Sequence, residues 1–139
     1  MEAWTCPACG RQFARLRQGH ECAPAMSLEQ YFSTGPRFER PIFDAVMAGL
    51  AAGGAGPVHV EPVSVGIFLK RPAKFAELRP MTKWTAVSFA LPRTLHSSRV
   101  ARKVFDAGVR KHHVVNVRDA GEVDQELLGW LLEAYDFAE

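Results

Sequence analysis

The feature that most constrains the fold of this chain is a group of four metal-ligating residue types near its start. Cys6 and Cys9 lie in a Cys-Pro-Ala-Cys-Gly segment, and His20 and Cys22 follow in a His-Glu-Cys segment. Two close pairs of sulfur and imidazole ligands are typical of a closed tetrahedral zinc site, in which no position stays open for water. The sequence therefore predicts one structural zinc ion.

The residues between these ligands favour a zinc knuckle. Pro7 restricts φ to a value that suits a tight turn, and Gly10 can adopt the positive φ that carries the chain past the second sulfur. Trp4, Phe13 and Leu16 are the only large apolar residues nearby. They are too few to fold the segment, so we expect metal binding to supply the folding free energy, about 10–16 kcal/mol in zinc-finger peptides.

Three other uses of these cysteines are less favoured. A disulfide would leave one of the three cysteines unpaired, and a redox Cys-x-x-Cys motif would follow a strand and precede a helix. A catalytic zinc would need an open ligand position. We therefore expect a zinc-binding module over residues 1–25, a short linker at 23–26, and a second domain over residues 26–139.

Composition indicates an ordinary globular protein, because 47% of the 139 residues are apolar and 23% are charged. The first residues contain neither a basic n-region nor an apolar h-region, so no signal peptide is expected. The longest uncharged stretch, residues 45–58, is too short and too rich in glycine to span a bilayer. Because metal-binding thiols must stay reduced, we expect a cytoplasmic protein without membrane contact.

Hydrophobic periodicity predicts an α+β domain with two N-terminal helices, an antiparallel sheet and one C-terminal helix. A capping box at Ser27–Gln30 begins a helix that ends near Phe32, and a second helix is expected over residues 37–52. The last helix is expected to begin at Asp119, with Glu122 in the capping-box position.

The strands are predicted from alternation of apolar and polar residues. One strand is expected to place Val63, Val65, Ile67 and Leu69 on a single face. Further strands are expected over residues 74–78, 84–91, 101–105 and 111–118, with the last two forming a hairpin around Asp106–Gly108. Short connections between them favour antiparallel pairing.

Charge is distributed unevenly along the chain. Residues 66–118 contain twelve Lys or Arg residues and two acidic ones, a net charge of +10, whereas residues 119–139 contain seven acidic residues and no Lys or Arg. Such polarity indicates an anionic partner for the basic segment. The alternative is that the acidic segment lies beside the basic one and cancels much of its field, and the sequence leaves both open.

One face of the predicted sheet is a candidate binding surface. If the helices cover the face with Ile67 and Leu69, the opposite face combines aromatic residues with cations, a combination that suits single-stranded nucleic acid or another anionic ligand. A solvated outer face is the alternative. The candidate ligand-binding residues are Phe68, Lys70, Trp84, His112, Asn116 and Arg118.

No catalytic residues are predicted. His112 and His113 are adjacent in an expected strand and therefore point to opposite faces, so they cannot share an ion or a proton. Ser97 and Ser98 lie near His96 but have no acidic partner and no nucleophile-elbow glycines.

Several segments resemble a known family in their order along the chain. They are Ser27–Phe32, Ile67–Lys70, Phe75–Arg79, Phe89–Arg93, Val114–Arg118 and Leu127–Tyr135. Together they resemble bacterial proteins with the domain of unknown function 5655 over about residues 27–138, and some members look to have a similar Cys/His module in front. The resemblance implies an α+β domain without an established activity. Related domains occur beside nuclease-like modules in larger proteins, which by analogy favours nucleic acid as the ligand of this chain.

The sequence thus leads to one main functional hypothesis and two alternatives. The main hypothesis is a non-catalytic, zinc-containing protein that binds nucleic acid or another anionic partner through a basic sheet region. One alternative is a small-molecule-binding protein or enzyme with a pocket between helices and sheet. The other is an adaptor that captures a protein partner through the zinc module.

Overall fold

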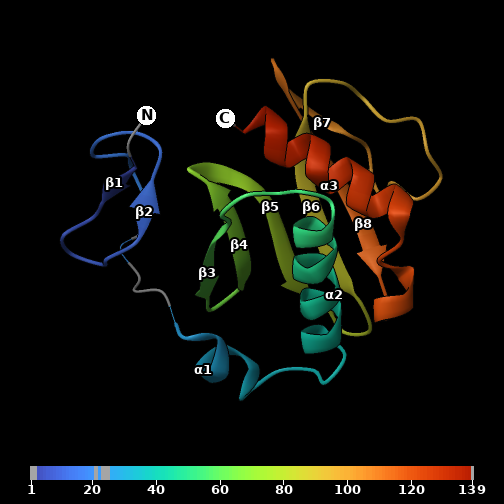
Figure 1. The fold of residues 1–139 in the computed structure, drawn as a ribbon, viewed down its shortest axis with the longest axis horizontal. Coiled ribbons are helices and arrows are strands. Elements are labelled where there is room, and N and C mark those ends of the chain that lie inside the picture. The colour runs from blue at the N-terminus through green and yellow to red at the C-terminus, as the bar shows by residue number, and fades with distance from the viewer. Residues whose placement is uncertain (1–2, 21, 23–25, 139) are drawn as a thin grey trace.

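The computed structural model describes residues 3–20, 22 and 26–138, and it has the predicted α+β fold (Figure 1). Within these residues a two-stranded sheet precedes a six-stranded antiparallel sheet of order β3-β4-β5-β6-β8-β7. The elements are β1 (Trp4–Thr5), β2 (Gln12–Phe13), α1 (Leu28–Phe32), α2 (Glu39–Ala52), β3 (His59–Val63), β4 (Gly66–Arg71), β5 (Ala73–Pro80), β6 (Thr85–Leu91), β7 (Phe105–Ala107), β8 (Arg110–Val117), the short 3-10 helix η1 (Ala120–Glu122) and α3 (Gln125–Phe137). Of the predicted linker at 23–26, residues 23–25 lie outside the described part of the chain.

The first two helices follow the prediction closely. At the start of α1 the Gln30 backbone N–H donates to Ser27 Oγ at 3.1 Å, and the Ser27 N–H donates back to Gln30 Oε1 at 3.1 Å. This reciprocal pair is the expected capping box. In α2, Ile42, Val46 and Leu50 are buried at helical spacing.

The predicted start of the last helix was wrong by one turn. Asp119 caps η1 by accepting the Gly121 N–H, whereas Asp124 caps α3 by accepting the Leu127 N–H at 3.0 Å. Between them, Val123 has ψ of 78° and interrupts the helical backbone. Two acidic residues with the same capping chemistry lie five positions apart, and the structure uses both.

The single strand predicted through Val63, Val65, Ile67 and Leu69 was also wrong. The chain turns at residues 64–65, so β3 and β4 form a hairpin in which Val63 pairs with Gly66 and Pro62 with Ile67. Because side chains alternate between faces, Val63 lies on the face opposite Ile67, and Val65 is 51% exposed in the turn. The hairpin turn interrupted an apparent period of two.

The predicted strand at residues 101–105 is shorter and lies later in the chain. β7 pairs Phe105 with His112 and Ala107 with Arg110, and before it only Val100 makes an isolated bridge, to Val115. Gly108 has φ of +76° in the turn to β8. The expected hairpin therefore forms, but the segment between β6 and Phe105 is largely irregular.

The domain has a layer of helices on one face of the sheet and the N-terminal module on the other. α2 and α3 cover the face of Ile67, Leu78 and Val87, all of which are fully buried (Figure 1). The opposite face, here called the outer face, includes Glu61 and Phe68 and contacts the module at β3 and β4. None of the helices in the described residues is long and apolar enough to cross a membrane.

Candidate metal centre and outer sheet face

The N-terminal module is a tight turn that presents two cysteines. The Gly10 N–H donates to the Cys6 carbonyl at 2.8 Å, and the Cys6 N–H donates to the Arg11 carbonyl at 2.9 Å. Gly10 has φ of +75°, a region that favours glycine. β1 and β2 flank this turn, pairing Trp4 with Phe13.

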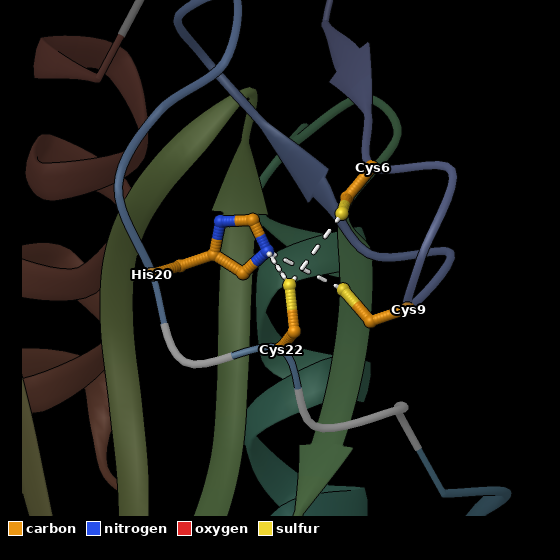
Figure 2. A group of neighbouring side chains, drawn as sticks. All are labelled: Cys6, Cys9, His20 and Cys22. Carbon is orange, nitrogen blue, oxygen red and sulfur yellow. Dashed lines mark hydrogen bonds between the residues drawn. The ribbon is translucent and has the colours of Figure 1, made fainter.

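All four predicted ligands point toward one another (Figure 2). Their ligand atoms lie within 4.8 Å of one another and form a group that can hold one metal ion. The Sγ atoms of Cys6 and Cys22 are 3.8 Å apart, and His20 Nε2 lies 3.5 Å from Cys9 Sγ and 3.2 Å from Cys22 Sγ. A regular tetrahedron with zinc–sulfur bonds of about 2.3 Å and zinc–nitrogen bonds of about 2.0 Å gives edges of about 3.8 and 3.5 Å. These three distances are therefore close to the edges of a tetrahedral site of this size.

Neighbouring groups prepare two of these side chains, His20 and Cys6, for metal binding. His20 Nδ1 lies 2.7 Å from the Gln18 carbonyl, which can only accept, so Nδ1 carries the proton and Nε2 is free to coordinate. Burial alone would raise the pKa of Cys6, but the backbone N–H groups of Cys9 and Ala8 and the nearby thiols lower it to about 6. Cys6 thus favours the thiolate that a metal requires.

The module contacts the outer face through a buried carboxylate that the sequence analysis did not identify. Glu61 is 1% exposed, and its Oε1 accepts hydrogen bonds from Arg11 Nε at 3.0 Å and from Lys70 Nζ at 2.9 Å. Its Oε2 accepts the Gln12 N–H at 2.9 Å and lies 2.9 Å from His59 Nε2. Lys70 Nζ also donates to the Gln12 carbonyl at 2.7 Å. Both the N–H and the carbonyl of Gln12 in β2 are therefore hydrogen-bonded to side chains of the six-stranded sheet.

The charges of this contact are set by burial and by pairing together. Burial would raise the pKa of Glu61, but hydrogen bonds from Lys70, the Gln12 N–H and Arg11 outweigh it and lower the pKa to about 2. Burial also lowers the pKa of Lys70, and the Glu61 carboxylate opposes that change. Glu61 is accordingly ionised at neutral pH.

The six candidate ligand-binding residues fall into separate places. Phe68 is half-buried beside the module, and Lys70 is 4% exposed with its ammonium already bonded to Glu61. His112 and Asn116 are exposed on the outer face of β8, opposite Ala90 and Ala86.

Trp84 and Arg118 lie just beyond the strands. Trp84 precedes β6 and Arg118 follows β8, and the Arg118 guanidinium carbon is 6.0 Å from the Trp84 ring centroid. At about 3.3 Å per residue, Arg118 lies about 20 Å along the strand from His112. The structure therefore does not bring Trp84, His112 and Arg118 around one ligand.

The acidic C-terminal segment neutralises arginines on the helix side of the sheet. α3 packs against β5 and β6 on the face that carries Leu78 and Val87. Arg93 makes two hydrogen bonds to Glu133, at 2.8 and 2.9 Å, and Arg99 bonds both Asp124 and Glu126, at 2.8 and 3.0 Å. The cations of the outer face are not among these pairs.

Three adjoining hollows follow the outer face from the module across β5, β6 and β8 toward the turn between β5 and β6. The first, of about 180 Å³, lies between the module and β4 and shares Lys74 with the second, of about 220 Å³. The second shares Glu77, Ser88 and Val114 with the third, of about 210 Å³. Their cations are Arg11, Lys70, Lys74, Arg79 and Arg102, against the carboxylates Glu77 and Glu61, a net charge of +3.

The comparisons with known proteins give one family match and no activity. A model of the family described as Domain of unknown function (DUF5655) matches residues 28–138. No curated protein and no solved structure matches the chain.

Proposed function

We propose that this chain, which belongs to the domain of unknown function 5655 family, is a zinc-containing binding protein that holds single-stranded nucleic acid on the outer face of its sheet. In this proposal residues 1–25 form the zinc module and residues 26–139 the binding domain. Zinc is the favoured ion because three thiolates and one imidazole suit its soft character and tetrahedral geometry. The role of the ion is structural, and no residue is assigned to catalysis.

The observation that carries the proposal is the line of three hollows with a net charge of +3. A positively charged groove that tracks a phosphate backbone is the usual basis of binding to single strands. Arg102 is exposed beside the third hollow and makes no ion pair with any residue in the described part of the chain. The helix-covered face of the sheet is less suited to a nucleic-acid strand, since apolar core residues fill the space between helices and sheet and acidic residues of α3 lie at its edge.

A salt titration tests this function. Fluorescently labelled single-stranded DNA and RNA are titrated with the zinc-loaded full chain at several salt concentrations. For three to five phosphate contacts we expect the logarithm of the association constant to fall with the logarithm of salt concentration with a slope of about −2 to −3.5. Absence of binding at low salt, or affinity that is indifferent to salt, would refute the proposal.

A pair of variants separates the outer face from general charge. Arg102→Ala should reduce the slope by about 0.7, because one phosphate contact is lost. Arg93→Ala, which removes an equal charge from the helix side, should leave the slope unchanged. Equal effects of the two variants would mean that the protein attracts the strand by its overall charge and not by this face.

A further inference from the structure

The first hollow has walls from both parts of the molecule. Arg11 and Phe13 come from the module, and Phe68, Lys70 and Lys74 come from β4 and β5. Neither the module nor the sheet forms this cavity alone, so its shape depends on the contact at Glu61.

A β-bulge shapes the sheet side of this cavity. The register between β4 and β5 shifts after Leu69, so that Lys70 pairs with Lys74 while Leu69 pairs with Ala76. Bulges re-aim side chains and are frequent beside binding sites. Here the bulge brings the ammonium groups of Lys70 and Lys74 to the same end of the outer face. A nucleic-acid strand with one negative charge per nucleotide would be attracted to this end.

The ring of Phe68 is the aromatic surface of the cavity. It is half-buried, with the Lys74 ammonium 4.6 Å and the Arg11 guanidinium carbon 5.5 Å from its centroid. On its other wall Phe13 packs against the Lys70 ammonium at 4.1 Å. Cations held at aromatic rings are the surroundings in which nucleic-acid bases stack and their phosphates are neutralised.

The size of the cavity limits what it holds. At about 30 Å³ for each water molecule, a volume of about 180 Å³ equals about six waters. This is room for one flat ring system, and the sugar and phosphate attached to it would lie outside, near Lys74 and the second hollow.

We propose that this cavity binds one unpaired nucleobase of the nucleic-acid strand, stacked on Phe68, with the adjoining phosphates at Lys74. The inference rests on the proposed function, because the remaining nucleotides occupy the outer face. It makes binding selective for single strands, since a base in a duplex is already paired and stacked. It also makes base recognition depend on the zinc module, which supplies Arg11 and Phe13.

The test compares two probes with the same number of phosphates, an oligothymidine of about twelve nucleotides and an abasic oligonucleotide of equal length. The zinc-loaded wild type should bind oligothymidine about 5- to 150-fold more tightly than the abasic probe, the range for one stacked base. Phe68→Leu keeps an apolar side chain without a ring, so it should abolish this preference, and its affinity for oligothymidine should fall much further than its affinity for the abasic probe. Phe68→Tyr keeps the ring and should retain the preference.

The outcomes separate this inference from the proposed function. Equal affinity of the wild type for both probes, or an equal loss for both probes in Phe68→Leu, overturns the base site while salt-dependent strand binding stands. Failure of both probes to bind at low salt overturns the two proposals together. Competition by free thymidine monophosphate tests whether the bound base belongs to a nucleic-acid strand or to a free nucleotide. If the mononucleotide binds as tightly as oligothymidine, the cavity is a site for free nucleotides, and the proposal of strand recognition is overturned.

Discussion

The N-terminal module and the α+β domain are stabilised by different interactions. In the domain, α2, α3 and the strands β4, β5, β6 and β8 contribute buried apolar residues to one continuous core. In the module, Phe13 is buried against the His20 ring at 4.0 Å between centroids, while Leu16 is 75% exposed. Apolar burial contributes about 25 cal/mol per Å² to the free energy of folding. A cluster as small as this one therefore adds little to the stability of the module. The domain therefore depends on the hydrophobic effect, and we expect the module to depend on a metal ion held by its four candidate ligands.

The contact between the two parts differs from both. It is made by charged groups that burial has removed from water, chiefly Glu61, Lys70 and Arg11, with Lys70 and Arg11 also at the rings of Phe13 and Phe68. Buried ion pairs add little net stability relative to apolar residues of similar volume, but removing one partner leaves the other charge uncompensated. Such a contact fixes the position of the module more than it stabilises the protein.

The largest expected effect is the loss of the metal site. Cys9→Ser, or removal of the metal with a chelator, should unfold the module, because the metal-binding free energy at stake is about 10–16 kcal/mol. The α+β domain should stay folded, since its core contains none of the ligands. Elemental analysis measures bound zinc, and hydrogen exchange measures backbone protection in each part.

Leu131→Ala provides the opposite change. Leu131 is a fully buried residue of α3, and its truncation should lower the free energy of unfolding of the domain by about 2–5 kcal/mol in urea titrations. The folded protein should keep its full zinc content. If chelation melted the domain as well, or if the chelated module kept its protected amides, the comparison drawn above would be wrong.

The next effect concerns the contact itself. Glu61→Ala should lower the free energy of unfolding by about 3–5 kcal/mol, because Lys70 and Arg11 would remain buried without a carboxylate. Hydrogen exchange should show faster exchange in β2 while zinc stays bound. The measurement is a urea titration combined with exchange at the Gln12 amide, which donates to Glu61.

Glu77→Ala is the matched control for Glu61→Ala. Glu77 also bridges two cations on the outer face, Lys74 at 2.9 Å and Arg79 at 3.0 Å, but their side chains are 47% and 49% exposed. Its loss should cost about 0–1 kcal/mol, as for exposed ion pairs. A similar cost for both carboxylates would show that burial is not what distinguishes the contact.

Much of the fold could be predicted because its signals are local. Capping residues lie within four positions of the groups they bond, and the spacing of Cys6, Cys9, His20 and Cys22 identifies a metal group directly. The hairpin at residues 64–65 was missed because neither turn residue is Gly, Asn or Asp, and because Val65 continued an apparent alternation.

The outer face could be predicted only in part. Alternation alone assigned Phe68 and His112 to one face, but it carries no information on which residues cover that face. Glu61 contacts Arg11 from fifty positions away, and the only local signal was a carboxylate within the apolar strand His-Val-Glu-Pro-Val. Lys70 was predicted as a ligand-binding residue because the sequence does not show that its ammonium pairs with Glu61 on the neighbouring strand.

The smallest expected effect is a pH dependence that belongs to the domain and not to the module. His113 is fully buried in β8, its Nε2 accepts the Leu95 N–H at 3.0 Å, and its ring stacks on Phe89. Burial lowers the pKa of His113 below 6.5, and the charges of Arg93 and His112 lower it further. The unfolded chain therefore binds a proton at His113 more readily than the folded state does. The contribution of neutral His113 to the free energy of unfolding is fully present above about pH 6.5 and is lost as the pH falls below it.

His113→Gln should remove this dependence, because the Gln Oε1 can accept the Leu95 N–H and does not titrate. Below pH 6.5 the unfolding free energy of the wild type should fall more steeply than that of the variant, by at most about 1.4 kcal/mol per pH unit, the limit for one proton. Any release of the proposed metal ion in acid would be common to both proteins and would cancel in the difference between their urea titrations. Parallel pH profiles would show that His113 binds its proton equally in both states, and the acid sensitivity of the protein would then arise at the metal site.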